Sequence, residues 1–177
     1  EKRAFQYMKR GADVIGSIAI GFLSLATLPI IALLIRLESR GPILIRQKRV
    51  GQFGKEFLLY KYRTMIVLGP DGLAESHGAV WAEKNDKRIT RIGKLLRVTR
   101  VDELPQLWNI LRGDLSFIGP RPERPEFVST LREHIPYYDM RHLVRPGLSG
   151  WAQINPPYYY GTEKEAMIKL QYDLYYI

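Results

Sequence analysis

The chain has 177 residues, a formal net charge of +9 and no cysteine. This length is enough for one domain with a hydrophobic core, and the lack of cysteine excludes a disulfide framework. The sequence pI of about 9.8 fits binding to nucleic acid or to an anionic membrane surface, and charge alone does not choose between them. Because the chain starts at Glu1 and ends at Ile177 within a helical pattern, we expect it to be part of a longer protein.

Residues 14–35 form the strongest local pattern, because none of them is charged. As a helix this run would be about 33 Å long, which is enough to cross the hydrocarbon core of a bilayer. A secretory signal peptide does not explain the run, since residues 25–29 lack a convincing small-residue cleavage site and a well-patterned domain follows. The run therefore predicts a membrane helix.

Two features favour a re-entrant helix, which enters and leaves the same leaflet, over a helix that spans the membrane. Basic residues flank the run on both sides, and the positive-inside rule then holds both of its ends on the cytoplasmic face. Pro29 lies within the run, where a proline removes a backbone hydrogen bond and kinks a helix. The flanking basic residues are Lys2, Arg3, Lys9 and Arg10 before the run and Arg36, Arg40, Arg46, Lys48 and Arg49 after it.

Residues 43–50 and 55–65 read as two short strands around a glycine-containing turn at 51–54. A β-hairpin is the expected structure. It would bring four basic side chains near one another, and a solvated basic face is the alternative explanation for them. These residues are Lys48, Arg49, Lys61 and Arg63.

Residues 66–87 show little periodicity, and their glycines and proline predict an irregular segment. A loop of this length in a compact domain is often functional or mobile. Trp81 in this segment could lie at a membrane interface or pack against the core, and packing is the commoner arrangement. No catalytic or metal-binding pattern surrounds His77, His134 or His142, so we predict that the histidines lie on the surface.

Residues 88–100 predict a basic amphipathic helix capped by Thr90. Its apolar side chains are expected to face the core and its basic side chains to face solvent. The inward set is Ile92, Leu95 and Leu96, and the outward set is Arg91, Lys94 and Arg97.

Residues 97–126 are the most informative stretch for chemistry, because acids and arginines alternate there with stiff turns. Asp102 and Glu103 would point about 100° apart on a helix and should serve different partners. The two prolines of the segment Gly119-Pro120-Arg121-Pro122 have fixed φ, so this turn can direct Arg121 at low entropic cost. The planar guanidinium suits a pair of phosphate oxygens. Together these features indicate phosphoryl chemistry with a divalent metal, since Mg²⁺ prefers one or two carboxylates plus substrate phosphates.

A purely structural explanation of the same acids stays open at this point. The pair Thr99 and Asp102 has the spacing of a helix capping box. Acids in the first turn of a helix are also favoured by the helix dipole. Spacing alone does not decide between a cap and a catalytic pair.

The C-terminal third predicts further helices separated by turns. Residues 127–133 form a helical pattern that Pro136 ends. A glycine-containing turn then carries Trp151, exposed or half-buried, and Arg145 could contact a phosphate or a lipid. The last segment keeps helical spacing at Met167, Leu170, Leu174 and Ile177. An aromatic belt at the lipid headgroups and core packing explain the tyrosines at 158–160, 172, 175 and 176 about equally well.

Three separated motifs occur in a fixed order: YKYRTM, VDELPQLWNILRGDLSFIGPRPE and RPGLSGWAQIN. Together they resemble the signature of the bacterial sugar transferases, the monotopic phosphoglycosyl transferases that start glycan assembly on polyprenyl phosphate. The resemblance extends from Lys9 to Tyr176. It is closest to the C-terminal catalytic domain of the larger members, which carry an additional N-terminal membrane region and initiate exopolysaccharide or O-antigen synthesis. By resemblance to these larger members, a homodimer is expected.

The resemblance implies a monotopic α+β protein, mostly helical with a small β-hairpin and with an N-terminal re-entrant helix broken at Pro29. Residues 1–40 would form the membrane part, and residues 41–177 the catalytic domain on the cytoplasmic face of the bacterial inner membrane. Many members carry Ser-Pro at the break, where this chain has Leu28-Pro29. Ser24 or Thr27 could supply the missing hydroxyl for the carbonyls at the bend.

By resemblance, the reaction moves a sugar-1-phosphate from a UDP-sugar to undecaprenyl phosphate and releases UMP. Asp102 would form a covalent aspartyl-phosphosugar intermediate, and Glu103 would help to position Mg²⁺, so that both acids count as catalytic and metal-binding residues. UDP-glucose or UDP-galactose is a plausible donor; membrane lipids are the other expected partners, and nucleic acid is not expected. The substrate- and phosphate-binding residues would be Lys61, Arg63, Arg97, Arg121, Pro122, Glu123 and Arg145.

Three other classes of protein compete with this interpretation. A nucleic-acid-binding protein fits the charge but not the long uncharged run, and no common nucleic-acid motif is present. A membrane-anchored interaction domain fits the run but does not require the acid pair Asp102 and Glu103 beside a rigid arginine turn. A lipid-phosphate hydrolase uses similar charges, and only the identity of its product separates it from a transferase.

Overall fold

The structure is a computed structural model that describes residues 2–68, 86–155 and 163–177. The expectations for His77, Trp81 and the tyrosines at 158–160 concern residues outside this part. The helices and strands are α1 (Lys2–Ser24), α2 (Leu28–Glu38), β1 (Leu44–Val50), β2 (Glu56–Tyr62), α3 (Arg91–Val98), α4 (Gln106–Arg112), β3 (Ser116–Ile118), α5 (Pro125–His134), β4 (Gly147–Ser149), α6 (Trp151–Ile154) and α7 (Glu163–Tyr176). Short 3₁₀ turns lie at η1 (Leu25–Thr27), η2 (Gln52–Gly54), η3 (Val101–Glu103) and η4 (Tyr138–Leu143).

This mixture of helices and two small sheets confirms the predicted α+β class and the predicted hairpin of β1 and β2. The chain forms two compact units. Among the described residues, the first unit contains 2–46, 60–68 and 86–112, and the second contains 47–59, 113–155 and 163–177. The predicted division into a membrane part, 1–40, and a catalytic part, 41–177, refers to a bilayer and stays a prediction.

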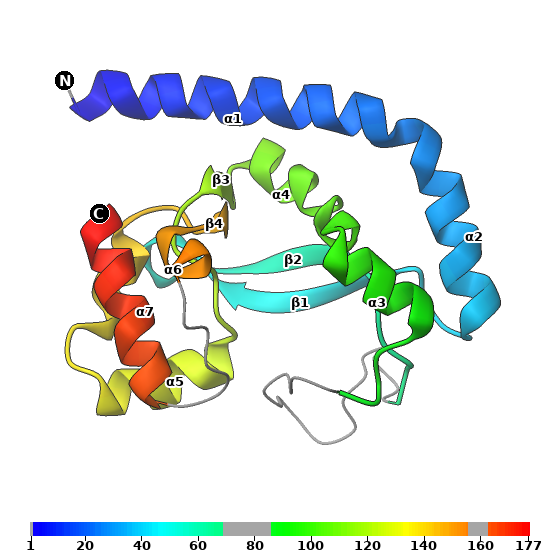
Figure 1. Ribbon diagram of the computed structural model, residues 1–177. Coiled ribbons are helices and arrows are strands. Elements are labelled where there is room, and N and C mark those ends of the chain that lie inside the picture. Colours follow the sequence, from blue (N-terminus) through cyan, green and yellow to red (C-terminus); the bar gives the residue numbers. More distant parts are fainter. Residues whose placement is uncertain (1, 69–85, 156–162) are drawn as a thin grey trace. The chain divides into compact units, whose positions relative to one another are not determined.

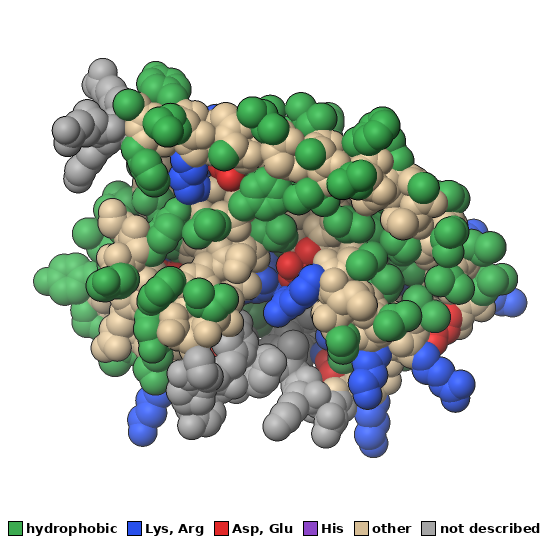
Figure 2. All heavy atoms as spheres, turned by 45° about the horizontal axis from the view of Figure 1, so that its top comes forward, with side chains coloured by type: hydrophobic (Ala, Val, Ile, Leu, Met, Phe, Trp, Pro, Cys, Tyr) green, Lys and Arg blue, Asp and Glu red, His purple; other side chains and the backbone are tan. Residues whose placement is uncertain are grey.

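The first unit begins with a long bent apolar helix. Residues Ala4–Glu38 are long and apolar enough to cross a membrane, judged by length and composition. Figure 1 shows α1 and α2 running in different directions on either side of η1. Figure 2 shows hydrophobic side chains gathered along the surface of this helix. The exposed large hydrophobic residues of α1 include Ile15, Phe22 and Leu23. Such a surface is unusual in water and suits a lipid environment.

The break in this helix lies just before Pro29 rather than at it. Pro29 occupies the first turn of α2, where a missing N–H costs no intrahelical hydrogen bond. At the bend the Ser24 hydroxyl donates to the carbonyl of Gly21 at 2.9 Å, and the Thr27 hydroxyl donates to the carbonyl of Ser24 at 2.7 Å. The expectation that these hydroxyls serve carbonyls at the bend is therefore confirmed, whereas the re-entrant path stays a prediction.

Helices α2 and α3 and the end of β2 build the core of the first unit. Its buried members are Ile31, Ile35, Tyr62 and Leu96. Gly93 lets α3 approach the segment that follows β2, because a Cβ at this position would collide with the carbonyl of Thr64. The predicted cap is confirmed, since the Thr90 hydroxyl accepts a hydrogen bond from the Gly93 amide at 2.9 Å.

The predicted orientation of α3 is wrong at two residues. Leu95 is 56% exposed instead of inward, and Arg97 turns inward, where its Nε donates to the Thr64 hydroxyl at 2.8 Å. A helix of eight residues is too short for its periodicity to fix both faces. The inward arginine is the more consequential difference, because it places a cation inside the first unit.

Helix α1 is attached to α4 through a basic side chain. The Arg10 guanidinium donates to the carbonyls of Ile110 and Leu111, at 2.5 and 2.7 Å. These carbonyls lie at the C-terminal end of α4, where the helix dipole favours a cation. Arg10 therefore ties the apolar helix to the helix that follows Asp102.

The second unit has its own core between α5, η4 and α7. Its buried members are Val50, Val128, Leu131, Ile135, Tyr138, Ala166 and Leu170. Strands β3 and β4 pair in parallel, with Ser116 opposite Gly147 and Ile118 opposite Ser149. His134 is exposed as predicted, whereas His142 is buried, so the prediction that every histidine lies on the surface is wrong. Burial lowers the pKa of His142, and the neighbouring Asp139 carboxylate opposes this shift.

Candidate active site

Asp102 and Glu103 lie in the tight turn η3 between α3 and α4. Arg100 enters this turn with φ 59° and ψ 13°, a left-handed conformation that is uncommon and strained for a residue other than glycine. Both acids are buried, with exposed fractions of 5% and 8%. Adjacent buried acids at a strained turn are costly, and functional sites are where such strain concentrates.

The capping-box explanation of Asp102 is wrong. The Thr99 hydroxyl donates to the carbonyls of Leu95 and Leu96, at 2.9 and 3.2 Å, so it closes the end of α3. No side chain caps the start of η3. Among the described residues, Oδ1 of Asp102 is buried without a hydrogen-bond partner, although buried polar atoms are normally paired. This oxygen is thus available to a substrate atom or a metal ion.

Opposing effects set the charge state of Asp102. Burial raises the pKa of its carboxyl, and Glu103 adds to this shift. Lys61 lowers the pKa most among the neighbouring cations, and Arg97 and Arg100 also lower it. The structure therefore brings Asp102, Glu103, Lys61 and Arg97 into one electrostatic cluster within the first unit.

Arg63 is not part of this cluster. Its guanidinium donates to the carbonyls of Ile35, Ser39 and Arg40 and to the Ser39 hydroxyl, at 2.7 to 3.3 Å. These acceptors lie at the C-terminal end of α2, and the side chain is only 3% exposed. The geometry therefore gives Arg63 the role of holding the apolar helix, and we leave it out of the proposed binding residues.

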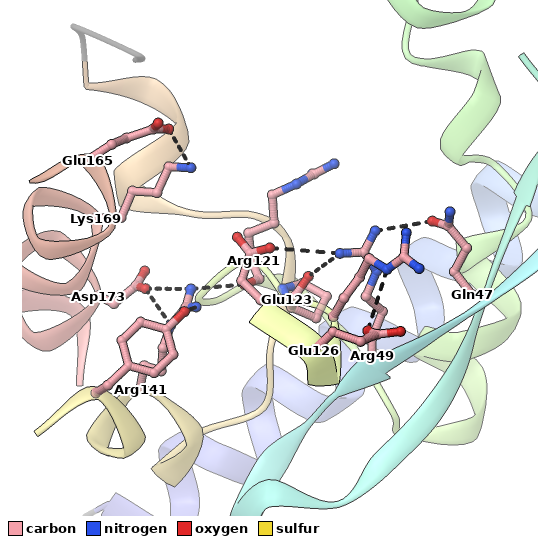
Figure 3. Close-up of polar contacts among 12 residues, drawn as sticks. Gln47, Arg49, Arg121, Glu123, Glu126, Arg141, Glu165, Lys169 and Asp173 are labelled. Atoms are coloured by element: carbon pink, nitrogen blue, oxygen red, sulfur yellow. Dashed lines mark hydrogen bonds and ion pairs between the residues drawn. The ribbon is translucent and has the colours of Figure 1, made fainter. Parts of the chain in front are cut away.

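In the predicted stiff turn around Arg121, four consecutive backbone carbonyls accept hydrogen bonds. The two outer carbonyls accept from backbone amides, Pro120 from Gly147 and Glu123 from Val50, each at 2.9 Å. The two inner carbonyls accept from arginines, Arg121 from Arg141 at 2.9 Å and Pro122 from Arg49 at 3.2 Å. In Figure 3, Arg141 and Arg49 approach this loop from its two sides. These hydrogen bonds thus add to the rigidity that the prolines give the turn.

The remaining predicted residues lie next to this loop. The Glu123 carboxylate lies 3.8 Å from Nη1 of Arg49, and helix α5 starts two residues later, at Pro125. The carbonyl of Arg145 packs so closely on Gly119 that a Cβ there would collide with it. Arg121, Pro122, Glu123 and Arg145 therefore form a second group, within the second unit.

The first group fits a magnesium ion. In the described part of the chain no cluster of three or more His, Asp and Glu side chains could hold a metal ion by itself. Mg²⁺ does not require one, since it usually keeps water and binds substrate phosphates beside one or two carboxylates. The unpaired oxygen of Asp102 and the adjacent Glu103 match that donor set.

Sequence reasoning missed three polar residues that support these groups. Thr64 binds Arg97, and Arg141 and Asp173 form a buried ion pair behind the Arg121 loop. A signal for Asp173 existed, because it follows Ala166 and Leu170 at helical spacing on the buried face of α7. An acid on a buried helix face implies a buried partner.

Comparison with known proteins identifies the family of this chain. A family model described as bacterial sugar transferase matches residues 4–177. The chain is 45% identical to the UDP-N-acetylgalactosamine-undecaprenyl-phosphate N-acetylgalactosaminephosphotransferase of Aeromonas hydrophila, over 98% of this chain and 40% of that protein. It is 46% identical to a putative undecaprenyl-phosphate N-acetylgalactosaminyl 1-phosphate transferase of Bacillus subtilis, over 76% of this chain and 72% of that protein.

A third relative carries a different sugar in its name. It is the UDP-glucose:undecaprenyl-phosphate glucose-1-phosphate transferase of Escherichia coli, 40% identical over 84% of this chain and 31% of that protein. The chain thus spans less than half the length of the Aeromonas and Escherichia relatives. Because the family model covers nearly all of its residues, this chain belongs to the bacterial sugar transferase family.

Proposed function

We propose that the chain catalyses transfer of a sugar-1-phosphate from a UDP-sugar to undecaprenyl phosphate, with release of UMP. The observation that carries the proposal is the buried Asp102 carboxylate, which has an unpaired oxygen and lies among cations. Family membership supports it, because the relatives named above are undecaprenyl-phosphate sugar phosphotransferases.

The proposed chemistry has two steps with Asp102 as the nucleophile. One carboxylate oxygen bonds to the phosphorus next to the sugar, the bond from this phosphorus to the bridging oxygen of the diphosphate breaks, and UMP leaves with the bonding electrons. An oxygen of undecaprenyl phosphate then attacks the same phosphorus. The acyl phosphate bond breaks, and the carboxylate is restored.

The charges of the first unit suit this chemistry. A carboxylate attacks only in its ionised form, and Lys61 and Arg97 favour that form against the effect of burial. The same cations would neutralise charge on the transferring phosphate. Asp102 and Glu103 would hold the magnesium ion, which supplies further charge neutralisation at the phosphates when it is bound.

The second group supplies a fixed cation for a phosphate. Arg121 projects from a loop whose backbone is held on both sides, and a preorganised guanidinium binds phosphate oxygens with little loss of entropy. Arg121, assisted by Arg145 and by Glu123 through Arg49, would bind the donor diphosphate.

The apolar helix would anchor the chain in the bacterial inner membrane. We propose that Ala4–Glu38 is re-entrant, that the catalytic residues lie on the cytoplasmic face, and that the polyprenyl chain of the acceptor lies along this helix. The names of the relatives make UDP-N-acetylgalactosamine and UDP-glucose the first donors to test. UDP-galactose, which the family resemblance also suggested, is the next.

A UMP-release assay tests the proposal. The chain in nanodiscs with Mg²⁺, undecaprenyl phosphate and each UDP-sugar should release UMP only when the acceptor is present, and Asp102→Asn should abolish the release. Without acceptor, wild type but not Asp102→Asn should gain the mass of one phosphosugar. Sustained UMP release without acceptor would indicate a hydrolase instead, and no release with any donor from a folded wild type would favour a membrane-anchored interaction domain.

A further inference from the structure

The second unit contains a buried ion pair that the proposed chemistry does not use. Arg141 in η4 and Asp173 in α7 are 4% and 1% exposed. Nε and Nη2 of Arg141 lie 3.0 and 2.8 Å from Oδ2 of Asp173. Nη1 donates to the Tyr138 hydroxyl at 2.6 Å. Asp173 in α7 and Tyr138 in η4 therefore both hold the Arg141 guanidinium.

The remaining contact of this guanidinium is with the backbone of the proposed phosphate ligand. Nη2 of Arg141 donates to the carbonyl of Arg121 at 2.9 Å, and Figure 3 shows Arg141 between Asp173 and this carbonyl. One side chain thus links helix α7 to the residue that presents the Arg121 side chain. Lysine, with a single ammonium, could not reproduce this forked geometry.

A buried ion pair is by itself weak evidence for a role in stability. Taking two charges out of water is costly, and apolar residues of similar volume often replace a buried ion pair without loss of stability. Burial raises the pKa of Asp173, and Arg141 opposes that shift. Burial by itself would lower the pKa of Arg141, but Tyr138, Asp173 and Glu123 outweigh burial and raise it. Arg141 therefore keeps its positive charge in the core.

The loop has a second arginine contact, and it is the weaker one. Arg49 donates to the carbonyl of Pro122 at 3.2 Å and lies 3.8 Å from the Glu123 carboxylate. Its side chain is 16% exposed, against 4% for Arg141. A shorter hydrogen bond from a fully buried cation is the stronger constraint. Arg141 is thus the buried cation that donates directly to the carbonyl of Arg121.

We propose that Arg141 is a positioning residue for the transfer reaction: paired with Asp173, it fixes the backbone of Arg121 and so directs the Arg121 guanidinium toward a phosphate of the nucleotide substrate. This inference rests on the proposed function. It predicts that the pair acts on binding of the nucleotide phosphate and acts only through Arg121.

The test compares Arg141→Lys and Asp173→Asn with wild type in nanodiscs. Loss of an oriented charged hydrogen bond should raise the KM for the UDP-sugar and the Kd of UMP by about tenfold, with a smaller change in kcat. Val128→Ala serves as a matched control, since Val128 belongs to the same core but forms none of the hydrogen bonds to the Arg141 guanidinium. It should lower Tm without raising the Kd of UMP.

A double-mutant cycle with Arg121→Ala separates positioning from general damage. Once the Arg121 guanidinium is absent, Arg141→Lys should weaken UMP binding by less than about twofold. Should Arg141→Lys fail to fold, Asp173→Asn carries the same cycle. Unchanged KM and Kd in both variants, an equal rise in Val128→Ala, or full additivity with Arg121→Ala would each overturn the inference. Failure of wild type to bind UMP would instead show that the proposed function itself is wrong.

Discussion

Replacement of Arg63 by methionine should release the end of the apolar helix rather than abolish phosphate binding. The guanidinium makes four hydrogen bonds to Ile35, Ser39 and Arg40 at 2.7 to 3.3 Å. Methionine keeps much of the apolar contact but leaves three helix-terminal carbonyls without this donor. Since a hydrogen bond from a charged donor contributes about 1.5–3 kcal/mol and the losses share one side chain, we expect local destabilisation of about 3–5 kcal/mol.

Hydrogen exchange in nanodiscs measures this effect directly. A loss of about 3–5 kcal/mol should speed exchange of the amides near the end of α2 at least a hundredfold, if they open locally. Arg36→Met is the matched control, because Arg36 lies on the same helix, is exposed and makes one hydrogen bond, to the carbonyl of Gly41 at 3.0 Å. Its effect should stay below about 1 kcal/mol.

The outcome distinguishes two roles for Arg63. If it holds the helix, the Kd of UMP in Arg63→Met should remain within about twofold of wild type at temperatures where the variant is folded. Unchanged exchange at the end of α2 together with a large rise in the Kd of UMP would refute the structural role and restore the phosphate-binding role that the YKYRTM motif suggested.

Two further results are expected. In Lys61→Gln the pKa of Asp102 should rise further, because the cation that lowers this pKa most is lost. The acid limb of the pH profile of kcat/KM should then move to higher pH, and an unchanged limb would contradict this. Because the chain has no cysteine, Gln6→Cys and Lys55→Cys can report the membrane path. Both thiols should resist an impermeant reagent in intact cells and react in inverted vesicles, whereas a spanning helix would expose one of them outside.

Local features of the fold could be predicted from the sequence because local residues determine them. The hairpin follows from two short strands around a glycine-containing turn, and the Thr90 cap follows from residues three positions apart. The parallel pair β3 and β4 was missed, because each strand has three residues and their pairing depends on the close approach of Gly119 and Gly147. No periodicity within either segment reports such a contact.

The candidate site shows the same limit. The sequence placed Asp102 and Glu103 near the start of a helix, but it could not show that they lie in the turn η3 or that Oδ1 of Asp102 lacks a partner. Arg63 shows a related limit. Its motif marks the position, yet its hydrogen bonds go to backbone carbonyls in and just after the last turn of α2, more than twenty residues earlier in the chain. The type of a residue predicts which chemistry its side chain can perform, and its tertiary contacts determine which role it has.

The Arg121 loop shows why a correct prediction can have an incomplete reason. Two prolines were expected to hold the turn, and fixed φ angles do reduce the freedom of Pro120 and Pro122. They leave ψ free, however, so they cannot set the direction of Arg121 by themselves. The hydrogen bonds to four consecutive carbonyls supply that constraint. Two of these bonds come from the arginines Arg49 and Arg141, so the direction of Arg121, the arginine proposed to bind a phosphate, depends on two others that need not touch the substrate.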